Sequence, residues 1–184
     1  METVIIAVWL ILPAYTPNMG AAFFGKGTPI DFGKILWDNR RILGDGKTYK
    51  GLFFGISCGI LTGFFQMIAI DSNLHILFNL PLFGIDLINS LIVISSLAIG
   101  SLFGDIFMSF FKRRVGLKRG AAFPLIDQLD FVFGAWILTY LTHPTWFIEN
   151  FTMNVIIAIL IITPILHIVT NMVGYLIGIK KEPW

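Results

Sequence analysis

Five long apolar runs dominate the pattern of hydrophobic and polar positions along the chain. Taking roughly 20 residues as one membrane-spanning helix, the runs predict spans at about 3–20, 51–70, 86–111, 121–141 and 151–179. A further apolar stretch at 72–84 is shorter and contains Pro81, which favours a re-entrant or interfacial hairpin. The pattern therefore predicts an all-α integral membrane protein with five transmembrane helices, forming a single domain over residues 1–184.

The distribution of cations supports this count, because five spans put every Lys and Arg on one side of the membrane. Six of the 13 lie in the loop 25–50, five in the loop 112–120 and two at the C-terminus. The positive-inside rule then places the N-terminus outside and the C-terminus in the cytoplasm. Only 13% of the residues are charged, against roughly 25% in a soluble domain. We expect a multi-pass protein of the cell membrane.

A stripe of glycines follows one face of the second predicted span. Gly51, Gly55, Gly59 and Gly63 recur at every fourth position, so they share a helical face. Small residues allow a neighbouring helix to approach closely in membranes. The stripe predicts either tight helix packing or a smooth groove for a lipid chain.

The fifth span carries a polar thread at helical spacing, which comprises Thr163, His167, Thr170, Asn171 and Gly174. A single histidine in a membrane helix usually forms a hydrogen bond with a neighbouring helix. A contact between His167 and a substrate is the less common alternative.

Three carboxylates, Asp105, Asp127 and Asp130, stand inside or beside the apolar runs. An aspartate at the centre of a span costs roughly 2.5 to 3.5 kcal/mol, so it normally faces a cavity, a partner or an ion. Asp105 shares a helical face with Ser109 and Lys112, whereas Asp127 and Asp130 are three residues apart near the start of the fourth span. We therefore expect two adjacent helices to present the three carboxylates to one point on the cytoplasmic side.

Hard carboxylate oxygens suit Mg²⁺, which commonly completes its coordination with water and with the phosphate oxygens of a substrate. The five cations that follow the third span would attract such phosphates. Under the alternative interpretation, the carboxylates pair with Lys112, Arg113 or Arg119 and only stabilise the helix bundle.

The first cytoplasmic loop shows helical periodicity of its own. Its polar residues Asp31, Lys34, Asp38 and Arg41 are spaced three, four and three apart, with apolar residues between them. This spacing predicts a short amphipathic helix over about 31–43, lying on the membrane surface as an interfacial helix. The residues GDGKT at 44–48 then lead into the second span, and a helix N-terminus preceded by glycines and a lysine favours phosphate. The alternative for this loop is an anchor that binds lipid head groups.

Three sequence blocks resemble the archaeal CDP-archaeol synthase family of cytidylyltransferases. The blocks are PAYxxN at 13–18, DxGKxxxDxRRILGDGKTxxG at 31–51 and GDxxxSFxKRRxGxxxGxxxPxxDQLDFVxGA at 104–135. The third block is also similar, more loosely, to the SxxxKR and DxxD signature of CDP-diacylglycerol synthases. Together the blocks cover most of the first 135 residues.

This resemblance implies Mg²⁺-dependent transfer of CMP from CTP to the phosphate of an unsaturated archaeal isoprenoid diether glycerophosphate, with release of pyrophosphate. It implies that Asp105, Asp127 and Asp130 bind the metal and act in catalysis together with Lys112 and Arg113. The substrate-binding residues implied on the same basis are Asn18, Lys26, Lys34, Asp38, Arg40, Arg41, Asp45, Lys47, Thr48, Ser109, Arg114 and Arg119.

Three other functions are compatible with parts of this pattern. A CDP-diacylglycerol synthase would act on ester lipids with the same groups. A small ion-coupled transporter would use the intramembrane acids, although the chain shows no inverted repeat with broken helices. A lipid-binding scaffold would need neither nucleotide chemistry nor ion coupling. The expected partners are CTP, the lipid and the bilayer; nucleic acid is not among them, and a homodimer is left open.

Overall fold

The computed structural model describes residues 2–70, 79–117, 123 and 125–178. Within these ranges the chain forms six helices and no strand: α1 (Glu2–Phe24), α2 (Tyr49–Ala69), α4 (Leu87–Arg114), α5 (Ile126–Thr142), α6 (Pro144–Asn150) and α7 (Met153–Leu176). The protein is therefore all-α over its described part, as its apolar runs predict.

Four of these helices, α1, α2, α4 and α7, are long and apolar enough to cross a membrane. They coincide with the first, second, third and fifth predicted spans. The predicted fourth span corresponds to α5, which has 17 residues, and the first residues of that prediction lie outside the described ranges. The short helix α6 was not predicted. The five-span count and the orientation in the membrane remain predictions.

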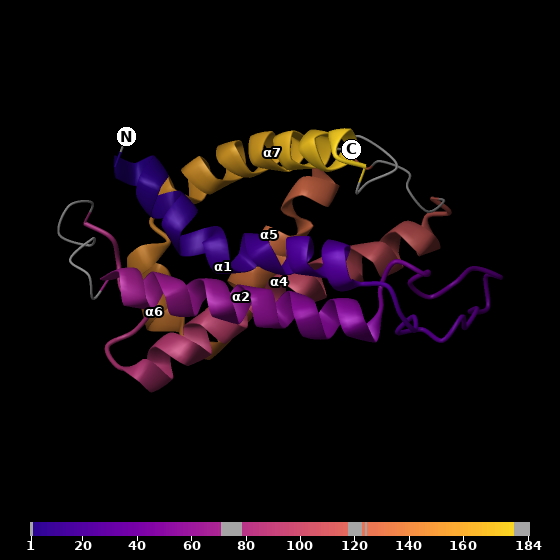
Figure 1. Ribbon diagram of the computed structural model, residues 1–184, viewed down its shortest axis with the longest axis horizontal. Helices are drawn as coiled ribbons and strands as arrows, with labels where there is room; N and C mark the ends of the chain where they lie inside the picture. The colour runs from indigo at the N-terminus through magenta and orange to yellow at the C-terminus, as the bar shows by residue number, and fades with distance from the viewer. Residues whose placement is uncertain (1, 71–78, 118–122, 124, 179–184) are drawn as a thin grey trace.

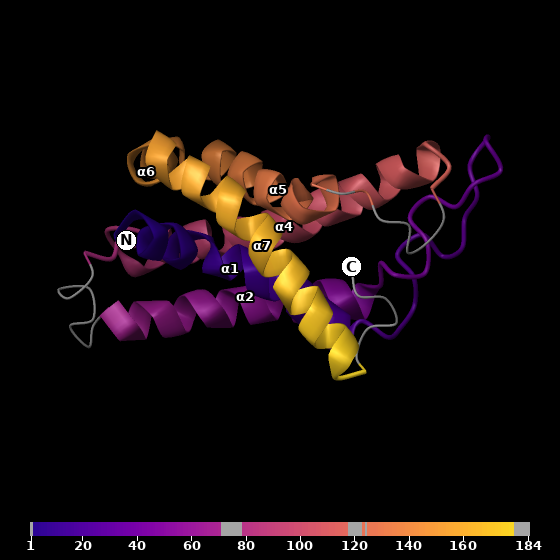
Figure 2. The same cartoon turned by 90° about the horizontal axis from the view of Figure 1, so that it is seen from above.

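α1, α2 and α4 run roughly along the long axis of the molecule, whereas α7 lies obliquely across them, as Figure 2 shows. α1 and α2 run side by side, α4 pairs with α5, and α7 crosses over α1 (Figure 2). The loop between α1 and α2 lies at the same end of the molecule as the C-terminal end of α4, and α6 lies at the opposite end. A buried core of Leu10, Ile11, Ile94, Leu97 and Val132 joins α1, α4 and α5.

The glycine stripe on α2 packs against α1 and α4. A Cβ atom built at Gly59 would lie 2.5 Å from the Ala98 Cβ and 2.7 Å from the Pro13 carbonyl oxygen. A Cβ atom at Gly55 would lie 2.8 Å from the Pro17 carbonyl oxygen. The prediction of tight packing is confirmed. A lipid groove along the stripe is wrong, because atoms of the neighbouring helices fill that space.

α1 continues through both of its internal prolines, and Figure 1 shows that it bends. Pro13 has no N–H, so the carbonyl of Trp9 loses its helical donor. The side-chain amide of Gln66 on α2 replaces that donor, with Nε2 lying 2.8 Å from the Trp9 oxygen. The bend is therefore stabilised by the helix that packs against it.

The closest approach between helices joins α4 and α5 at three glycines. A Cβ atom at Gly100 would lie 2.5 Å from the Gly134 carbonyl oxygen, and one at Gly104 would lie 2.2 Å from the Asp130 carbonyl oxygen. The two backbones touch directly, which only glycine allows at these positions. This contact places Asp105, the next residue of α4, beside the first turns of α5.

The loop 25–48 contains no helix, so the predicted interfacial helix over 31–43 is wrong. Phe32 and Asn39 have positive φ angles of 47° and 57°, and Gly33 has a φ of 80°. The Asp31 carboxylate accepts hydrogen bonds from backbone N–H groups within the loop, which offers the backbone an alternative to helical bonding. Isolated β-bridges join Pro29 to Thr48 and Ile35 to Arg41.

The predicted hairpin at 72–84 lies mostly outside the described residues. Its last part belongs to the core, because Phe83 is 1% exposed and its ring stacks with those of Trp9 and Trp146. The indole N–H groups of these tryptophans donate to the carbonyls of Pro81 and Leu82. This segment closes the end of the bundle opposite the loop 25–48.

Candidate active site

A cavity of about 270 Å³ lies between α1, α2, α4, α5 and α7. The polar residues that line it are Asn18, Lys47, Thr48, Asp105, Asp127, Asp130 and His167. Small and apolar residues complete the wall, namely Ala21, Ala22, Ile30, Gly46, Gly51, Leu52, Leu102 and Ile106. All three carboxylates singled out in the sequence therefore face one cavity.

Asp105 forms an ion pair with Lys47, which comes from the loop that precedes α2. The side chains of Lys47 and Asp105 are only 22% and 27% exposed, so water screens the pair incompletely. The alternative interpretation of the sequence paired this aspartate with a cation of its own helix end. The structure assigns the pairing to the first loop, which carries a positive charge directly to the acids.

Asp127 lies in the first turn of α5. Its carboxylate accepts hydrogen bonds from Lys112 Nζ at 2.5 Å and from the backbone N–H of Phe123 at 2.9 Å. A carboxylate in the first helical turn is also stabilised by the positive end of the helix dipole. The pairing of Asp127 with Lys112 agrees with the alternative interpretation, although Asp127 still lines the cavity.

Asp130 lies one turn further along α5, where its backbone carbonyl contacts Gly104. Its carboxylate accepts the N–H of Phe131 at 2.6 Å, and within the described part of the chain no Lys or Arg forms an ion pair with it. Among the described residues, Asp130 is thus the acid of the three that has no ion pair with a lysine or arginine. An uncompensated carboxylate in a half-buried cavity favours the binding of a cation.

The donor chemistry of this cavity fits a hard divalent cation, since carboxylate oxygens are the ligands that Mg²⁺ prefers. Among the described residues, no three acidic, histidine or cysteine side chains are close enough to share a metal ion. Two of the acids are instead occupied by lysines. Each lysine binds a single oxygen of its aspartate, so it is the separation of the acids that would have to decrease for all three to bind one ion.

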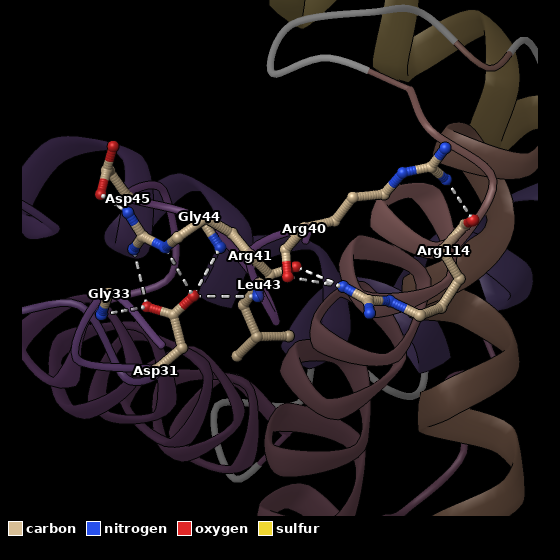
Figure 3. A network of polar contacts seen from close by, with 8 residues as sticks. All are labelled: Asp31, Gly33, Arg40, Arg41, Leu43, Gly44, Asp45 and Arg114. Atoms are coloured by element: carbon tan, nitrogen blue, oxygen red, sulfur yellow. Dashed lines mark hydrogen bonds and ion pairs between the residues drawn. The ribbon is translucent and has the colours of Figure 1, made fainter. Parts of the chain in front are cut away.

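The loop 25–48 is organised around Asp31, whose side chain is fully buried. Arg41 donates to it from Nη2 at 2.7 Å and from Nε at 3.2 Å, and the N–H groups of Gly33, Leu43 and Gly44 also donate (Figure 3). The Arg41 guanidinium, aided by these N–H groups, holds the pKa of the Asp31 carboxyl well below its usual range. The network fixes the path of the loop.

Arg41 forms a second ion pair, with Asp45, at 2.9 Å. The two carboxylates raise the pKa of the Arg41 guanidinium, chiefly through its hydrogen bond to Asp31. Arg41 and Asp45 do not line the cavity. The sequence assigned them to substrate, whereas the structure shows Arg41 bound to both Asp45 and Asp31.

A second network joins the loop to the end of α4 (Figure 3). Arg114 donates to Asp38 at 2.7 Å and to the backbone carbonyls of Arg40 and Arg41. In return, Arg40 donates to the backbone carbonyl of Arg114 at 2.6 Å. Three residues predicted to bind substrate, Asp38, Arg40 and Arg114, therefore bind other parts of the protein.

Of the remaining predicted residues, Asn18, Lys47 and Thr48 reach the cavity. The Thr48 hydroxyl is already used, because it accepts the Gly51 N–H as the N-cap of α2 and donates to the Gly25 carbonyl. Ser109 and Arg113 lie on α4 and do not line the cavity. Lys26 and Lys34 are exposed on the loop, and Arg119 lies outside the described residues.

The sequence pattern missed the apolar wall of the cavity. Leu102 and Ile106 are four residues apart on α4, on either side of Asp105, and Leu52 follows Gly51, the first glycine of the stripe on α2. The four-residue spacing of Leu102 and Ile106 around Asp105 is the sequence signal that could have identified this wall. His167 lines the cavity, and its Nδ1 lies 3.1 Å from the side-chain nitrogen of Asn171 on the same helix.

Comparison with known proteins places these residues in a family. Residues 1–184 match a family model described as "CarS-like: CDP-archaeol synthase". The CDP-archaeol synthase of Methanococcoides burtonii is 61% identical over 176 residues, which cover 95% of this chain and 100% of that protein. That of Methanosarcina barkeri is 57% identical over 175 residues with the same coverage.

A solved structure described as "Structural insight into an intramembrane enzyme for archaeal membrane lipids biosynthesis" has the same fold. It superposes with a TM-score of 0.73 at 32% identity, covering 92% of this chain and 94% of that one. The similarity thus extends over nearly the whole chain.

Proposed function

Because this chain belongs to the CDP-archaeol synthase family of membrane nucleotidyltransferases, we propose that CTP and a diether lipid are its substrates. The reaction transfers CMP from CTP to the phosphate of 2,3-bis-O-geranylgeranylglycerol 1-phosphate and releases pyrophosphate. The observation that carries the proposal is a cavity among apolar helices that combines three carboxylates with Lys47 and Asn18.

The chemistry places little demand on acid–base groups. A phosphate monoester has its second pKa near roughly 6, so it is mostly dianionic at neutral pH. One lipid phosphate oxygen attacks the α-phosphorus of CTP, the bond from that phosphorus to the bridging oxygen breaks, and pyrophosphate leaves with the electron pair. The main obstacle is repulsion between two polyanions, so the protein's task is orientation and charge compensation.

Lys47 is the cation best placed for the triphosphate, because it reaches the cavity from the start of α2. Its present partner is Asp105, and a bound polyphosphate would compete for the same ammonium group. Lys112 holds Asp127 in the same manner from the end of α4. Both lysines therefore keep positive charge beside the acids before substrate arrives.

Asp105, Asp127 and Asp130 are the residues that would hold Mg²⁺. When bound, the ion supplies neutralisation of charge on the phosphate oxygens. Their placement on the two packed helices α4 and α5 would orient the bound substrates. Asp130 is the acid for which this role is most direct, because no lysine or arginine in the described part of the chain pairs with it.

The lipid chains stay in the bilayer while the phosphate enters the cavity. Leu52, Leu102 and Ile106 give one wall of the cavity an apolar character that suits the glycerol end of such a lipid. We place this reaction at the cytoplasmic side of the cell membrane, where the positive-inside rule puts the loop 25–48.

The test is pyrophosphate release by the purified protein in detergent with CTP, Mg²⁺ and the unsaturated diether phosphate. Release should require both CTP and the lipid and should fail with ATP. Asp130→Asn should abolish it, whereas Asp86→Asn is a matched control because Asp86 caps the far end of α4 and asparagine also caps helices. Full activity of Asp130→Asn would contradict the proposed role of the acids.

The same assay separates the neighbouring functions. Release with an ester phosphatidate at a rate equal to or above that with the diether lipid would favour a CDP-diacylglycerol synthase. No release with any nucleotide, from protein shown to be folded, would favour the transporter, and counter-ion flux in liposomes would then test it.

A further inference from the structure

We propose that Arg40, Arg114 and Asp38 are positioning residues that clamp the loop 25–48 onto the end of α4 and thereby place Lys47 in the cavity. We call these three residues the loop clamp. The proposal rests on the proposed function, because it concerns the use of Lys47 with CTP. It differs from the sequence-based expectation that the same side chains bind substrate themselves.

The clamp uses the C-terminal end of α4, a helix that is longer than the hydrocarbon core of a bilayer is thick. α4 has 28 residues, so at 1.5 Å per residue it is about 42 Å long, against roughly 30 Å for the hydrocarbon core. The last carbonyls of a helix lack intrahelical donors. Arg40 supplies donors to the carbonyls of Arg113 and Arg114, and its charge favours the negative end of the helix dipole.

Arg114 makes the reciprocal contact from the helix to the loop. Its guanidinium binds the Asp38 carboxylate and two loop carbonyls, and it lies 5.2 Å from the centre of the Phe110 ring. Its side chain is only 17% exposed, and that of Asp38 is 25% exposed. Both terminal nitrogens of the guanidinium therefore donate to protein groups, and the Nε, which has no hydrogen-bond partner among the described residues, is buried away from the cavity.

A continuous set of contacts leads from the clamp to Lys47. The Arg41 carbonyl accepts from Arg114, while the Arg41 side chain binds Asp31. Asp31 in turn accepts the N–H of Gly44. Three residues later, the Lys47 carbonyl accepts the Ile30 N–H and the Lys47 side chain pairs with Asp105. Release of the clamp should therefore loosen the segment that carries Lys47.

Gly116 provides an independent sign that Arg40 is held in place. A Cβ atom at Gly116 would lie 3.0 Å from the Arg40 guanidinium, and the residue has a φ of +86°. Gly178 follows the end of α7 with a φ of +75°, and no atom of the described residues lies within 4 Å of the same position. Alanine causes similar backbone strain at both glycines, but only at Gly116 would it also displace Arg40.

The first experiment is a kinetic double-mutant cycle with Arg114→Ala and Lys47→Ala. Arg114→Ala should raise the KM for CTP about tenfold with a smaller change in kcat. In the Lys47→Ala background the same change should have little further effect, because Arg114 acts through Lys47. Equal effects of Arg114→Ala in both backgrounds would overturn the proposal and assign Arg114 to direct substrate contact.

The second experiment measures the loop without using activity. With Cys58 replaced by serine, spin labels at positions 37 and 107, both exposed in the native chain, report the distance between the loop and α4. Arg114→Ala and Gly116→Ala should broaden the distance distribution, and Gly178→Ala should not. An unchanged distribution in the first two variants overturns the clamp, even if the protein fails to use CTP, so the two proposals fail separately.

Discussion

Two regions hold the cavity together by different physical means. Where α4 meets α5, Gly100, Gly104 and Gly134 bring the two backbones into direct contact. At the nearby end of the molecule, the loop 25–48 is held by carboxylates and guanidinium groups. Inside the apolar bundle shape fixes the position of the helices, whereas at its end charge fixes the position of the chain.

Because one region is held by backbone packing and the other by ion pairs, we expect them to contribute differently to the reaction. The glycine contact is made by backbone atoms, which carry no titratable group, so the packing that positions Asp105 and Asp130 does not itself depend on pH or salt. The ion pairs of the loop are partly exposed to water, and such pairs respond to salt and pH. The carboxylates are thus the fixed element of the site, and Lys47 is the adjustable one.

The largest effect is expected from Gly104→Ala, which attacks the fixed element. Its Cβ atom would lie 2.2 Å from the Asp130 carbonyl oxygen, so α4 and α5 must separate. Overpacking of this kind costs about 3 kcal/mol, and a displacement of about 1 Å in a catalytic group can reduce the rate about 100-fold. Thermal unfolding in detergent and pyrophosphate release would both be measured.

Gly46→Ala is the matched control, because Gly46 also borders the cavity but no atom in the described part of the chain lies within 4 Å of its Cβ position. It should retain an unfolding temperature close to that of the native protein. If Gly104→Ala unfolds and reacts like Gly46→Ala, the backbone contact does not determine the geometry of the acids.

A smaller effect is expected from Asp31→Ala, which attacks the adjustable element. The change leaves the N–H groups of Leu43 and Gly44 without their acceptor, and unsatisfied donors of this kind cost about 1 to 3 kcal/mol. Because the loop lies outside the helix core, we expect faster proteolysis of the loop by trypsin and a higher KM for CTP, with little change in global unfolding. A large fall in the unfolding temperature would contradict this separation.

The same comparison explains what the sequence could predict. Helices α1, α2, α4 and α7 follow from apolar runs of sufficient length, and Asp105 and Asp127 were recognisable as acids in an apolar setting. The loop was mistaken for a helix because Asp31, Lys34, Asp38 and Arg41 have helical spacing. That spacing does not reveal that the Asp31 side chain competes for backbone N–H groups.

The contact between α4 and α5 was also not predicted. Gly100 and Gly104 show a small-residue spacing within α4, but the partner Gly134 is thirty residues further along the chain. Only the fold pairs these positions. Likewise, the assignment of Arg40 and Arg114 to substrate followed from their charge, whereas their partners are carbonyls and Asp38, which spacing alone does not identify.

The loop should also respond to pH through Asp31. Its pKa is lowered in the folded protein, so the unfolded loop binds the proton more readily, and stability is lost as pH falls. The contribution is complete above the ordinary aspartate pKa of about 3.9 and decreases as pH falls below it. A spin label at position 37, with Cys58 replaced by serine, should keep its mobility down to about pH 4 and become progressively more mobile as the pH falls further.

Asp31→Asn is the comparison for this titration, because it removes the ionisable group and keeps the side chain's shape. Its label should be more mobile at neutral pH and change less on acidification. A mobility that is independent of pH in the native loop would mean that Asp31 does not control the loop.

The smallest effect is expected from Asp45→Asn, although Asp45 pairs with the same arginine as Asp31. The Asp45 side chain is 58% exposed, and exposed ion pairs contribute about 0 to 1 kcal/mol. Asparagine should leave both the KM for CTP and the trypsin sensitivity of the loop nearly unchanged, with the slight remaining difference disappearing in high salt. A KM increase matching that of Asp31→Ala would mean that Asp45 contacts the nucleotide, and that Arg41 is held for substrate rather than for the loop.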